Sequence, residues 1–469
     1  MQLPNIPSPN SPVLIQMIRW VFSPMKYMEE CAQKYGDIFT LRVGENFAPL
    51  VFVSNPEALQ YILTNDTKIF TAPGEANSIF ESLLGKNSVV TVSDKKHKQK
   101  RQLLMPPFHG ERMRSYGDVI KNIVIETINE LPSNQPFCIR STTQRITLRA
   151  IMQAVFGLHE GERAQLIEKY LGEILDKSST PLSVLMLIFP SLRFDWGRFS
   201  PWGKNLIRQS KADQLIYEEI QQRRQQSNLD GEDILSLLMN ARDEQGEGMS
   251  DEELRDELMT LLVAGHETTA TALAWAFYWI HKYPNIKKKL LQEFDSLGDN
   301  PDSMKIFKLP YLNAVCCETL RIHPVGMLTF GRVSKMPTKL GNYEIETDTP
   351  IVGSIYLTHH REDLYPQSKQ FRPERFLEKQ FSPYEYIPFG AGARRCIGMA
   401  FAQFEIKLAL FYILSQWELN LINNKNLKPK RRGLVTAPEK PIMMTIQSRR
   451  NISYKNLESM KVNASAQSF

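Results

Sequence analysis

The chain has 469 residues, a hydrophobic share of 42% and a formal net charge of +6, from 57 basic and 51 acidic residues. This hydrophobic share is normal for a globular protein with a large core, and so mild a charge does not by itself indicate a nucleic-acid partner. The five cysteines are few, odd in number and without zinc-finger spacing, which argues against a secreted disulfide framework and favours a reducing compartment.

The N-terminal region shows no signal peptide and no membrane-spanning segment. Its most apolar stretch, VLIQMIRWVF at 13–22, is interrupted by Gln16 and Arg19, and a membrane span needs roughly 20 apolar residues. We therefore expect no transmembrane anchor. The stretch is predicted to pack on the body of a soluble, cytoplasmic protein, with weak peripheral contact with a membrane as the alternative.

The next segments show β-like and helical patterns without an internal repeat or a long linker. Residues 36–53 predict a hairpin, and 55–64 predict a helix. Helical patterns dominate from about 95 to 320, whereas 333–358 and 420–448 predict short strands. The predicted fold class is mostly α with small β-sheets (α+β). It forms a single domain over 1–448, followed by a polar, flexible tail at 449–469.

A basic helix is predicted within SDKKHKQKRQLLMPPFH, residues 93–109. His97 and Arg101 are four positions apart and therefore share one helix face. Two donors on one face suit two carboxylates of a ligand. The alternative is a solvated basic helix, which we expect for the lysines at 95, 96, 98 and 100.

The most extended helical pattern starts at a capping box formed by Ser250 and Glu253 and ends before Pro284, so it exceeds 30 residues. AGHETT, at 264–269, lies in its middle. Glu267 and Thr268 are costly in an apolar helix unless they have partners, and the Thr268 hydroxyl can bond a backbone carbonyl of its own helix. Two interpretations stay open, a solvated kink and a proton relay beside a pocket.

A Glu-x-x-Arg motif follows in LPYLNAVCCETLRIHP, residues 309–324. Glu318 and Arg321 are three positions apart on a predicted helix and can pair. Arg375, in FRPERF, offers a second guanidinium for the same carboxylate. Alone, the motif is weak, because a solvated surface pair has the same spacing.

The stretch FGAGARRCIG, at 389–398, sets Cys396 beside Arg394 and Arg395 in a glycine-rich loop before an apolar helix. Neighbouring cations and a helix N-terminus both favour a thiolate, which is the form that binds metals. The alternatives are an inert buried cysteine and a phosphate-binding loop, although Arg395 stands where that loop needs its third glycine.

In this order, HKQKR (97–101), AGHETT (264–269), ETLR (318–321) with PERF (373–376), and FGAGARRCIG (389–398) resemble the motifs of the cytochrome P-450 superfamily of haem-thiolate monooxygenases. The combination is most similar to soluble bacterial members, including those of cyanobacteria. The resemblance implies the P-450 fold, in which the long central helix lies over haem b and the cysteine loop lies beneath it.

The resemblance also implies a role for each motif residue. Cys396 would be the axial thiolate ligand of the haem iron. Glu267 and Thr268 would deliver protons, whereas His266 is expected to point away from the haem. The haem propionates would be bound by His97, Arg101 and Arg394, and Arg332 is a further candidate by its position after the Glu-x-x-Arg helix. Glu318, Arg321 and Arg375 would form a structural triad behind the cysteine loop.

The implied reaction inserts one oxygen atom of O2 into a hydrophobic substrate. Electrons would come from NAD(P)H through a separate ferredoxin or flavodoxin and its reductase, which Arg395 and the lysines of 95–100 would attract. Phe80, Met327, Leu328 and Phe330 are apolar pocket candidates, and no arginine stands out as a carboxylate clamp. A long-chain fatty acid or an alkane is therefore the favoured substrate, and a terpene comes second. The alternatives are a peroxide-driven haem-thiolate enzyme and a non-catalytic haem protein that binds a ligand.

Overall fold

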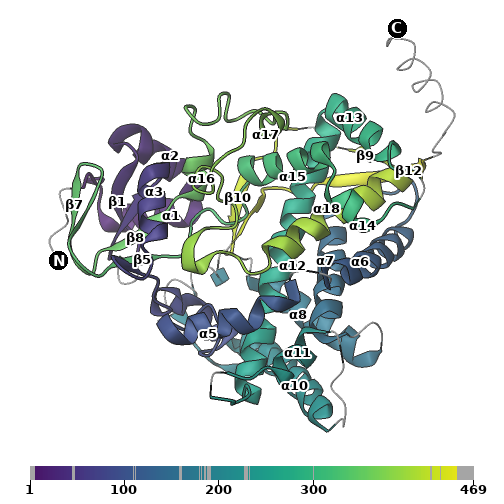
Figure 1. Ribbon diagram of the computed structural model, residues 1–469, viewed down its shortest axis with the longest axis horizontal. Coiled ribbons are helices and arrows are strands. Elements are labelled where there is room, and N and C mark those ends of the chain that lie inside the picture. The colour runs from purple at the N-terminus through teal and green to yellow at the C-terminus, as the bar shows by residue number, and fades with distance from the viewer. Residues whose placement is uncertain are drawn as a thin grey trace.

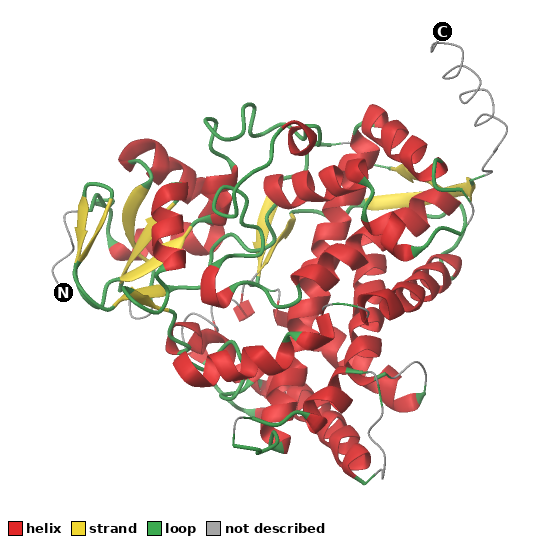
Figure 2. Cartoon of the chain, in the orientation of Figure 1, coloured by secondary structure: helices red, strands yellow, loops and turns green. Residues whose placement is uncertain are grey.

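The computed structural model describes residues 6–450, with short gaps at 45–47, 109, 111, 158–160, 179, 181, 184–185, 187–191, 226–230, 232, 244, 299, 423–424 and 434. Helices make up most of the described chain, and the largest sheet lies beside the N-terminal helices (Figures 1 and 2). This confirms the predicted fold class. The predicted C-terminal tail lies, from residue 451 onward, outside the described residues.

The helices are α1 (Val13–Phe22), α2 (Pro24–Tyr35), α3 (Pro56–Thr64), α4 (Glu81–Leu84), α5 (Asp94–Leu104), α6 (Arg112–Asn129), α7 (Ile139–Phe156), α8 (Glu162–Ser178), α10 (Pro201–Arg224), α11 (Ile234–Asn240), α12 (Asp251–Lys282), α13 (Pro284–Asp295), α14 (Ser303–Phe307), α15 (Pro310–Ile322), α16 (Ile355–His359), α17 (Arg375–Glu378) and α18 (Met399–Gln416).

The largest sheet has five strands in the order β1 (Ile38–Arg42), β2 (Pro49–Val53), β8 (Pro350–Gly353), β5 (Arg332–Ser334) and β3 (Phe70–Thr71). The smaller sheets are β4 (Phe137–Cys138) with β12 (Met443–Arg449) and β9 (Trp417–Leu421), β6 (Thr338–Leu340) with β7 (Tyr343–Ile345), and β10 (Pro429–Arg432) with β11 (Val435–Pro438). Strands β1 and β2 pair antiparallel, so the predicted hairpin at 36–53 is confirmed.

Helix α12 is the long central helix that the sequence predicts. It spans 32 residues, or roughly 48 Å at 1.5 Å per residue, and crosses the middle of the molecule (Figure 1). The capping box is present, with the Glu253 N–H donating to the Ser250 hydroxyl at 3.2 Å. The helix ends at Lys282, two residues before Pro284, which begins α13.

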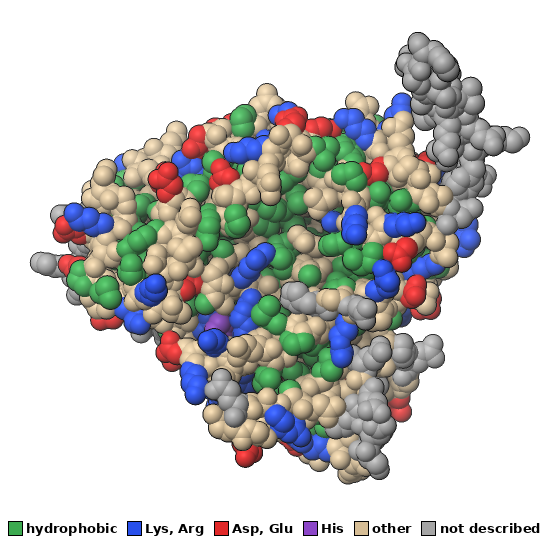
Figure 3. Space-filling view, in the orientation of Figure 1, with side chains coloured by type: hydrophobic (Ala, Val, Ile, Leu, Met, Phe, Trp, Pro, Cys, Tyr) green, Lys and Arg blue, Asp and Glu red, His purple; other side chains and the backbone are tan. Residues whose placement is uncertain are grey.

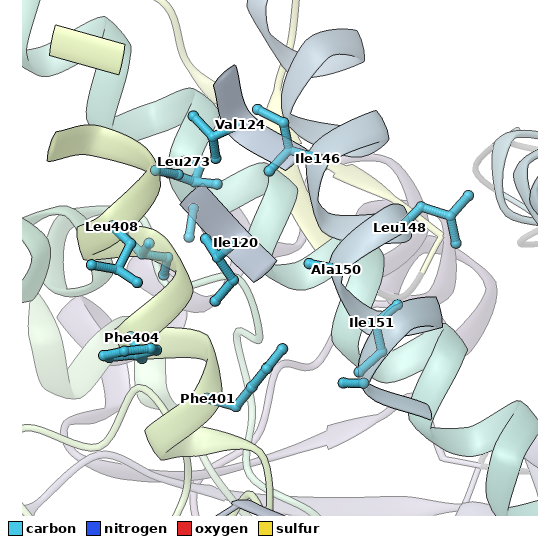
Figure 4. Packing of buried hydrophobic residues seen from close by; sticks show 14 of the residues in the cluster. Ile120, Val124, Ile146, Leu148, Ala150, Ile151, Leu273, Phe401, Phe404 and Leu408 are labelled. Atoms are coloured by element: carbon cyan, nitrogen blue, oxygen red, sulfur yellow. The ribbon is translucent and has the colours of Figure 1, made fainter. Parts of the chain in front are cut away.

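The apolar core lies where α6, α7, α12 and α18 meet. Phe404 and Leu408 of α18 lie near Ile120 of α6 and Leu273 of α12, and Ile146 reaches the same region from α7 (Figure 4). Because α18 begins just after the cysteine loop, packing of α18 in this core fixes one end of that loop relative to α12.

Helix α1 is only half covered. Met17 and Trp20 are buried, whereas Leu14 and Phe22 are 66% and 58% exposed. Within the described chain, none of the helices combines the length and the hydropathy that crossing a bilayer requires.

Lys100 is buried, so the prediction that it lies on a solvated basic helix is wrong. It is 4% exposed, and its ammonium lies 3.2 Å from the carboxylate of Glu257 on α12, so it is not on a solvated basic face. Lys95, Lys96 and Lys98 are exposed as predicted. The sequence does not reveal this difference, because the partner carboxylate lies more than 150 positions away. In the space-filling view, basic side chains lie over the region of α5 (Figure 3).

Buried histidines predict acid sensitivity. Burial lowers the pKa of His266 to about 3 and holds the pKa values of His323 and His359 well below 6.5. The unfolded chain therefore binds protons first, and stability that is complete above pH 6.5 is lost as the pH falls. We expect the free energy of unfolding to drop between pH 7 and 5.5 by up to ~1.4 kcal/mol per pH unit and histidine. Urea unfolding at these pH values measures the slope, and a flat profile would contradict the expectation.

Candidate active site

The cysteine loop is held between a turn and the start of α18. The Cys396 N–H donates to the Phe389 carbonyl at 3.0 Å, and Gly390 and Gly392 adopt φ angles of 65° and 71°, which favour glycine. Cys396 lies three residues before α18, as predicted. Its side chain faces a cavity inside the protein, so it borders open space although protein surrounds it.

Burial and charge act against each other on the Cys396 thiol. Burial raises its pKa, and the Gly398 N–H, Arg101 and Arg395 offset this only in part. Neighbouring cations therefore do not by themselves favour the thiolate over the thiol, although the sequence pattern predicts that they do. A metal ion bound to sulfur supplies the missing positive charge and deprotonates a ligating thiol outright.

Asp66 anchors the cysteine loop and was not predicted. Its carboxylate accepts the Ala393 N–H at 2.6 Å and lies 3.0 Å from Arg332 Nη2. A Cβ atom on Gly392 would lie 2.2 Å from the same carboxylate, so only glycine fits. Asp66 stands alone in the sequence, more than 300 residues from the loop, and no local pattern marks it.

The cavity above the loop has a volume of about 1120 Å³. It is bounded by Cys396 on one side and by Thr268 of α12. All four apolar residues predicted for the pocket line it, namely Phe80, Met327, Leu328 and Phe330. The Phe80 and Phe330 rings meet edge to face with centroids 6.2 Å apart.

The four predicted cationic residues, His97, Arg101, Arg332 and Arg394, all line this cavity. They lie close together: burial and the positive charges of Arg394, Arg101 and Arg332 lower the pKa of His97 to about 4. Burial and Arg332 likewise lower the pKa of Arg394 to about 10. With a pKa of about 4, His97 is neutral at pH 7, and the three arginines supply the positive charge that favours an anionic ligand.

The donors of the two buried arginines are already engaged. Arg394 donates to the carbonyls of Val89, Ala72 and Val92 at 2.7 Å each. Arg332 donates to the carbonyl of Phe330 at 2.7 Å and to Asp66. By contrast, among the described residues Arg101 donates to one carbonyl, that of Arg395, at 2.6 Å.

The polar residues in the middle of α12 face two directions. Thr268 lines the cavity, and its hydroxyl donates to the Ala264 carbonyl at 2.6 Å, as the sequence suggests. Glu267 also reaches the cavity wall, but both of its carboxylate oxygens are bound by α7. One pairs with Arg140, and the other accepts the Gln144 amide at 2.9 Å.

These contacts come from a polar stripe on α7 that sequence reasoning missed. Arg140, Thr143, Gln144 and Thr147 recur at helical spacing. Thr143 donates to the Ala270 carbonyl at 2.9 Å, and Thr147 lies 3.0 Å from His266 Nδ1. His266 is therefore engaged with α7. A run of polar residues at spacing 3 and 4 in a helix that is otherwise buried was the available signal.

The Glu-x-x-Arg residues form a fully buried network outside the cavity. The Glu318 carboxylate accepts Arg321 Nε at 2.6 Å, Arg375 Nε at 3.1 Å and the Arg372 N–H at 2.8 Å. Arg321 also donates to the His359 carbonyl at 2.7 Å, and the His359 ring accepts the Ile387 N–H at 3.0 Å. His359 thus links the network to the chain entering the cysteine loop.

Comparison with protein-family models decides the assignment, because the model described as Cytochrome P450 matches residues 6–446. The chain belongs to the cytochrome P450 family. It is accordingly a haem-dependent monooxygenase, an oxidoreductase in which iron is bound through a cysteine thiolate.

Curated P450 relatives and a solved structure agree with this assignment. The chain is 33% identical to cytochrome P450 135B1 of Mycobacterium tuberculosis over 449 residues, 95% of this chain and 92% of the relative. It is 30% identical to cytochrome P450 138 of the same species over 437 residues, 92% and 94% of the two chains. The structure entitled "Retinoic acid bound cyanobacterial CYP120A1" superposes with a TM-score of 0.82 at 24% identity, covering 95% of this chain and 100% of the other, and so shows the fold.

The residues around the P450 cavity fit a haem. Cys396 is the free thiol that borders the cavity, and the cationic cluster beside it lacks sufficient negative charge. An iron porphyrin supplies both complements, a metal for the sulfur and two propionates for the cations. Glycine at 390 and 392 leaves the loop without bulk on this side.

Proposed function

We propose that this P450 inserts one oxygen atom of O2 into a hydrophobic small molecule, a long-chain fatty acid, an alkane or a terpene. The apolar cavity between Cys396 and Thr268 carries the proposal, because it juxtaposes a metal-binding thiol, a hydroxyl and room for a large apolar ligand. We treat residues 1–448 as one catalytic domain working in the cytoplasm, with free cysteines suited to a reducing compartment.

Haem b, when bound, supplies the activation of O2. Cys396 would ligate its iron, and His97 and Arg101 would bind its propionates. Arg394 and Arg332, which line the same cavity, would add the positive charge that favours these carboxylates. The apolar wall at Phe80 and Phe330 excludes water and holds the substrate.

Protons enter from α12. The Thr268 hydroxyl donates its hydrogen to the Ala264 carbonyl and presents its lone pairs to the cavity, so it accepts a hydrogen bond there and positions a proton donor such as water. Glu267 replenishes the protons from the α7 side, where Arg140 and Gln144 fix its carboxylate. Glu318, Arg321 and Arg375 act only by stabilising the fold behind the cysteine loop.

Electrons come from NAD(P)H through a separate ferredoxin or flavodoxin and its reductase. Exposed cations support this proposal: Arg395 lies next to Cys396, and Lys95, Lys96 and Lys98 follow the exposed face of α5. Acidic electron carriers would be attracted to such a face, so association should slow as salt rises.

A binding screen followed by turnover tests the proposed function. Fatty acids, alkanes and terpenes are titrated into the haem-loaded protein, and displacement of iron-bound water is followed through the spin-state change in absorbance. Ligands that shift the spectrum are then incubated with NADPH and donor proteins, or with hydrogen peroxide alone. Oxidised product only with the donor system is expected. Product only with peroxide supports a peroxide-driven enzyme, and no oxidised product under either condition supports a ligand-binding role.

A further inference from the structure

One cation at the cavity differs from the others. Arg431, on strand β10, lines the cavity, and its Nη1 atom is buried without a hydrogen-bond partner. Its Nε donates to the Gly433 carbonyl at 3.2 Å, and its guanidinium lies 5.7 Å from the ring centre of Trp20, which also lines the cavity. Among the residues that the structure describes, no carboxylate forms an ion pair with Arg431.

Two other cavity arginines have a counter-charge, whereas Arg101 and Arg394 form no ion pair within the described chain and have the haem propionates as their proposed counter-charge. Arg332 is paired with Asp66, and Arg208 lies 3.1 Å from a Glu173 carboxylate oxygen. The Arg431 guanidinium has only the Trp20 ring and the Gly433 carbonyl as partners among the described residues, and burial lowers its pKa to about 10. Burying a charge without a partner is costly. An anion that binds here from outside the chain would therefore stabilise the Arg431 guanidinium.

The surroundings define the rest of that ligand. Trp20, Pro49, Leu50, Val352 and Val435 line the same cavity and are apolar. A guanidinium presents a planar fork of donors that matches a carboxylate. A cation that is left without a carboxylate partner among apolar side chains selects a molecule with one anionic head and a long apolar body.

We propose that Arg431 binds the carboxylate of an amphipathic substrate, so that the physiological substrate is an apolar monocarboxylate such as a long-chain fatty acid rather than an alkane or a neutral terpene. This rests on the proposed function and narrows its substrate class. The sequence alone does not mark Arg431 as a carboxylate clamp, because PKRRGL, at 429–434, has the composition of a solvated basic turn. Only the fold brings this hairpin to the cavity.

The test compares two ligands of equal chain length, dodecanoate and 1-dodecanol, on the haem-loaded protein. Affinities are measured by the spin-state shift and independently by calorimetry. Arg431→Gln should weaken dodecanoate binding at least about tenfold, in line with loss of a charge-assisted pair. The same variant should change the affinity for dodecanol by no more than about twofold. Arg431→Lys should restore part of the dodecanoate affinity. Lys430→Gln, an exposed neighbour on the same strand, removes the same charge and should change neither.

Stability supplies a second readout. Without ligand, Arg431→Gln should keep or raise the Tm, because it removes a charge that the protein leaves uncompensated, whereas loss of a merely structural arginine lowers it. Equal weakening of both ligands, or unchanged dodecanoate affinity in Arg431→Gln, would overturn the proposal. If the carboxylate preference depends on Arg431 but no oxidised product forms in the wild type, the proposed function fails. The assignment of Arg431 as the carboxylate-binding residue then still holds.

Discussion

Glu318→Ala should leave the protein poorly folded and largely without haem. Glu318 and Arg321 are fully buried, and one carboxylate compensates both Arg321 and Arg375. Removing it leaves two guanidinium groups uncompensated in the interior, which costs roughly 3–5 kcal/mol of stability. The loss should also free the chain entering the cysteine loop, because Arg321 holds His359 and His359 holds Ile387. Urea unfolding and the ratio of haem to protein measure the two effects.

A surface ion pair provides the matched control. Glu378 pairs with Arg372 while 53% of its side chain stays exposed. Such pairs contribute about 0–1 kcal/mol, so Glu378→Ala should fold and bind haem normally. A Glu318→Ala protein that is stable and haem-replete but inactive would show that the residue acts in catalysis and not in folding.

Thr268→Ala should keep the haem, its carbon-monoxide spectrum and substrate affinity but lose coupling. The hydroxyl lies at the cavity wall, and its hydrogen bond is to the Ala264 carbonyl, not to a residue assigned to haem binding. Its loss should therefore affect proton delivery alone. Removing a positioned proton-transfer group costs on the order of 10²–10⁴ in rate. The reduced donor is then still consumed, while hydrogen peroxide is released in place of oxidised product.

Two further variants sharpen this test. Thr268→Ser retains the hydroxyl and should recover most of the coupling. Glu267→Gln should uncouple as well, because Glu267 lies next to Thr268 and is fixed by Arg140 and Gln144. The ratio of product to donor consumed, with peroxide counted alongside, is the measurement. Normal coupling in both Thr268→Ala and Glu267→Gln would mean that these residues only accommodate a local distortion of α12.

Local signals predicted the elements that form the site. The capping box at Ser250 and the stop at Pro284 bounded α12, since both act within one helical turn. The glycines that precede an apolar helical pattern predicted that Cys396 lies in a loop just before a helix, and this signal is also local. The alternation in 36–53 predicted the hairpin whose second strand pairs with β8 and thereby forms one wall of the cavity.

Contacts between residues that are distant along the chain could not be predicted from the sequence. Asp66 meets Ala393 across more than 300 positions, and Arg140 meets Glu267 across more than 120. The same limit explains Lys100, which looks solvated in the sequence and is buried against Glu257. Burial decided these cases, and burial depends on how helices pack rather than on residue spacing within one helix.

The most direct test of the central claim is the spectrum of the reduced protein with carbon monoxide. We expect the absorption band at the position diagnostic of a thiolate-ligated haem in the wild type and in Cys138→Ser, which removes another thiol that is not fully buried. Cys396→Ser and Cys396→His should lack the band. Its retention in either Cys396 variant would contradict the assignment of Cys396 as the iron ligand.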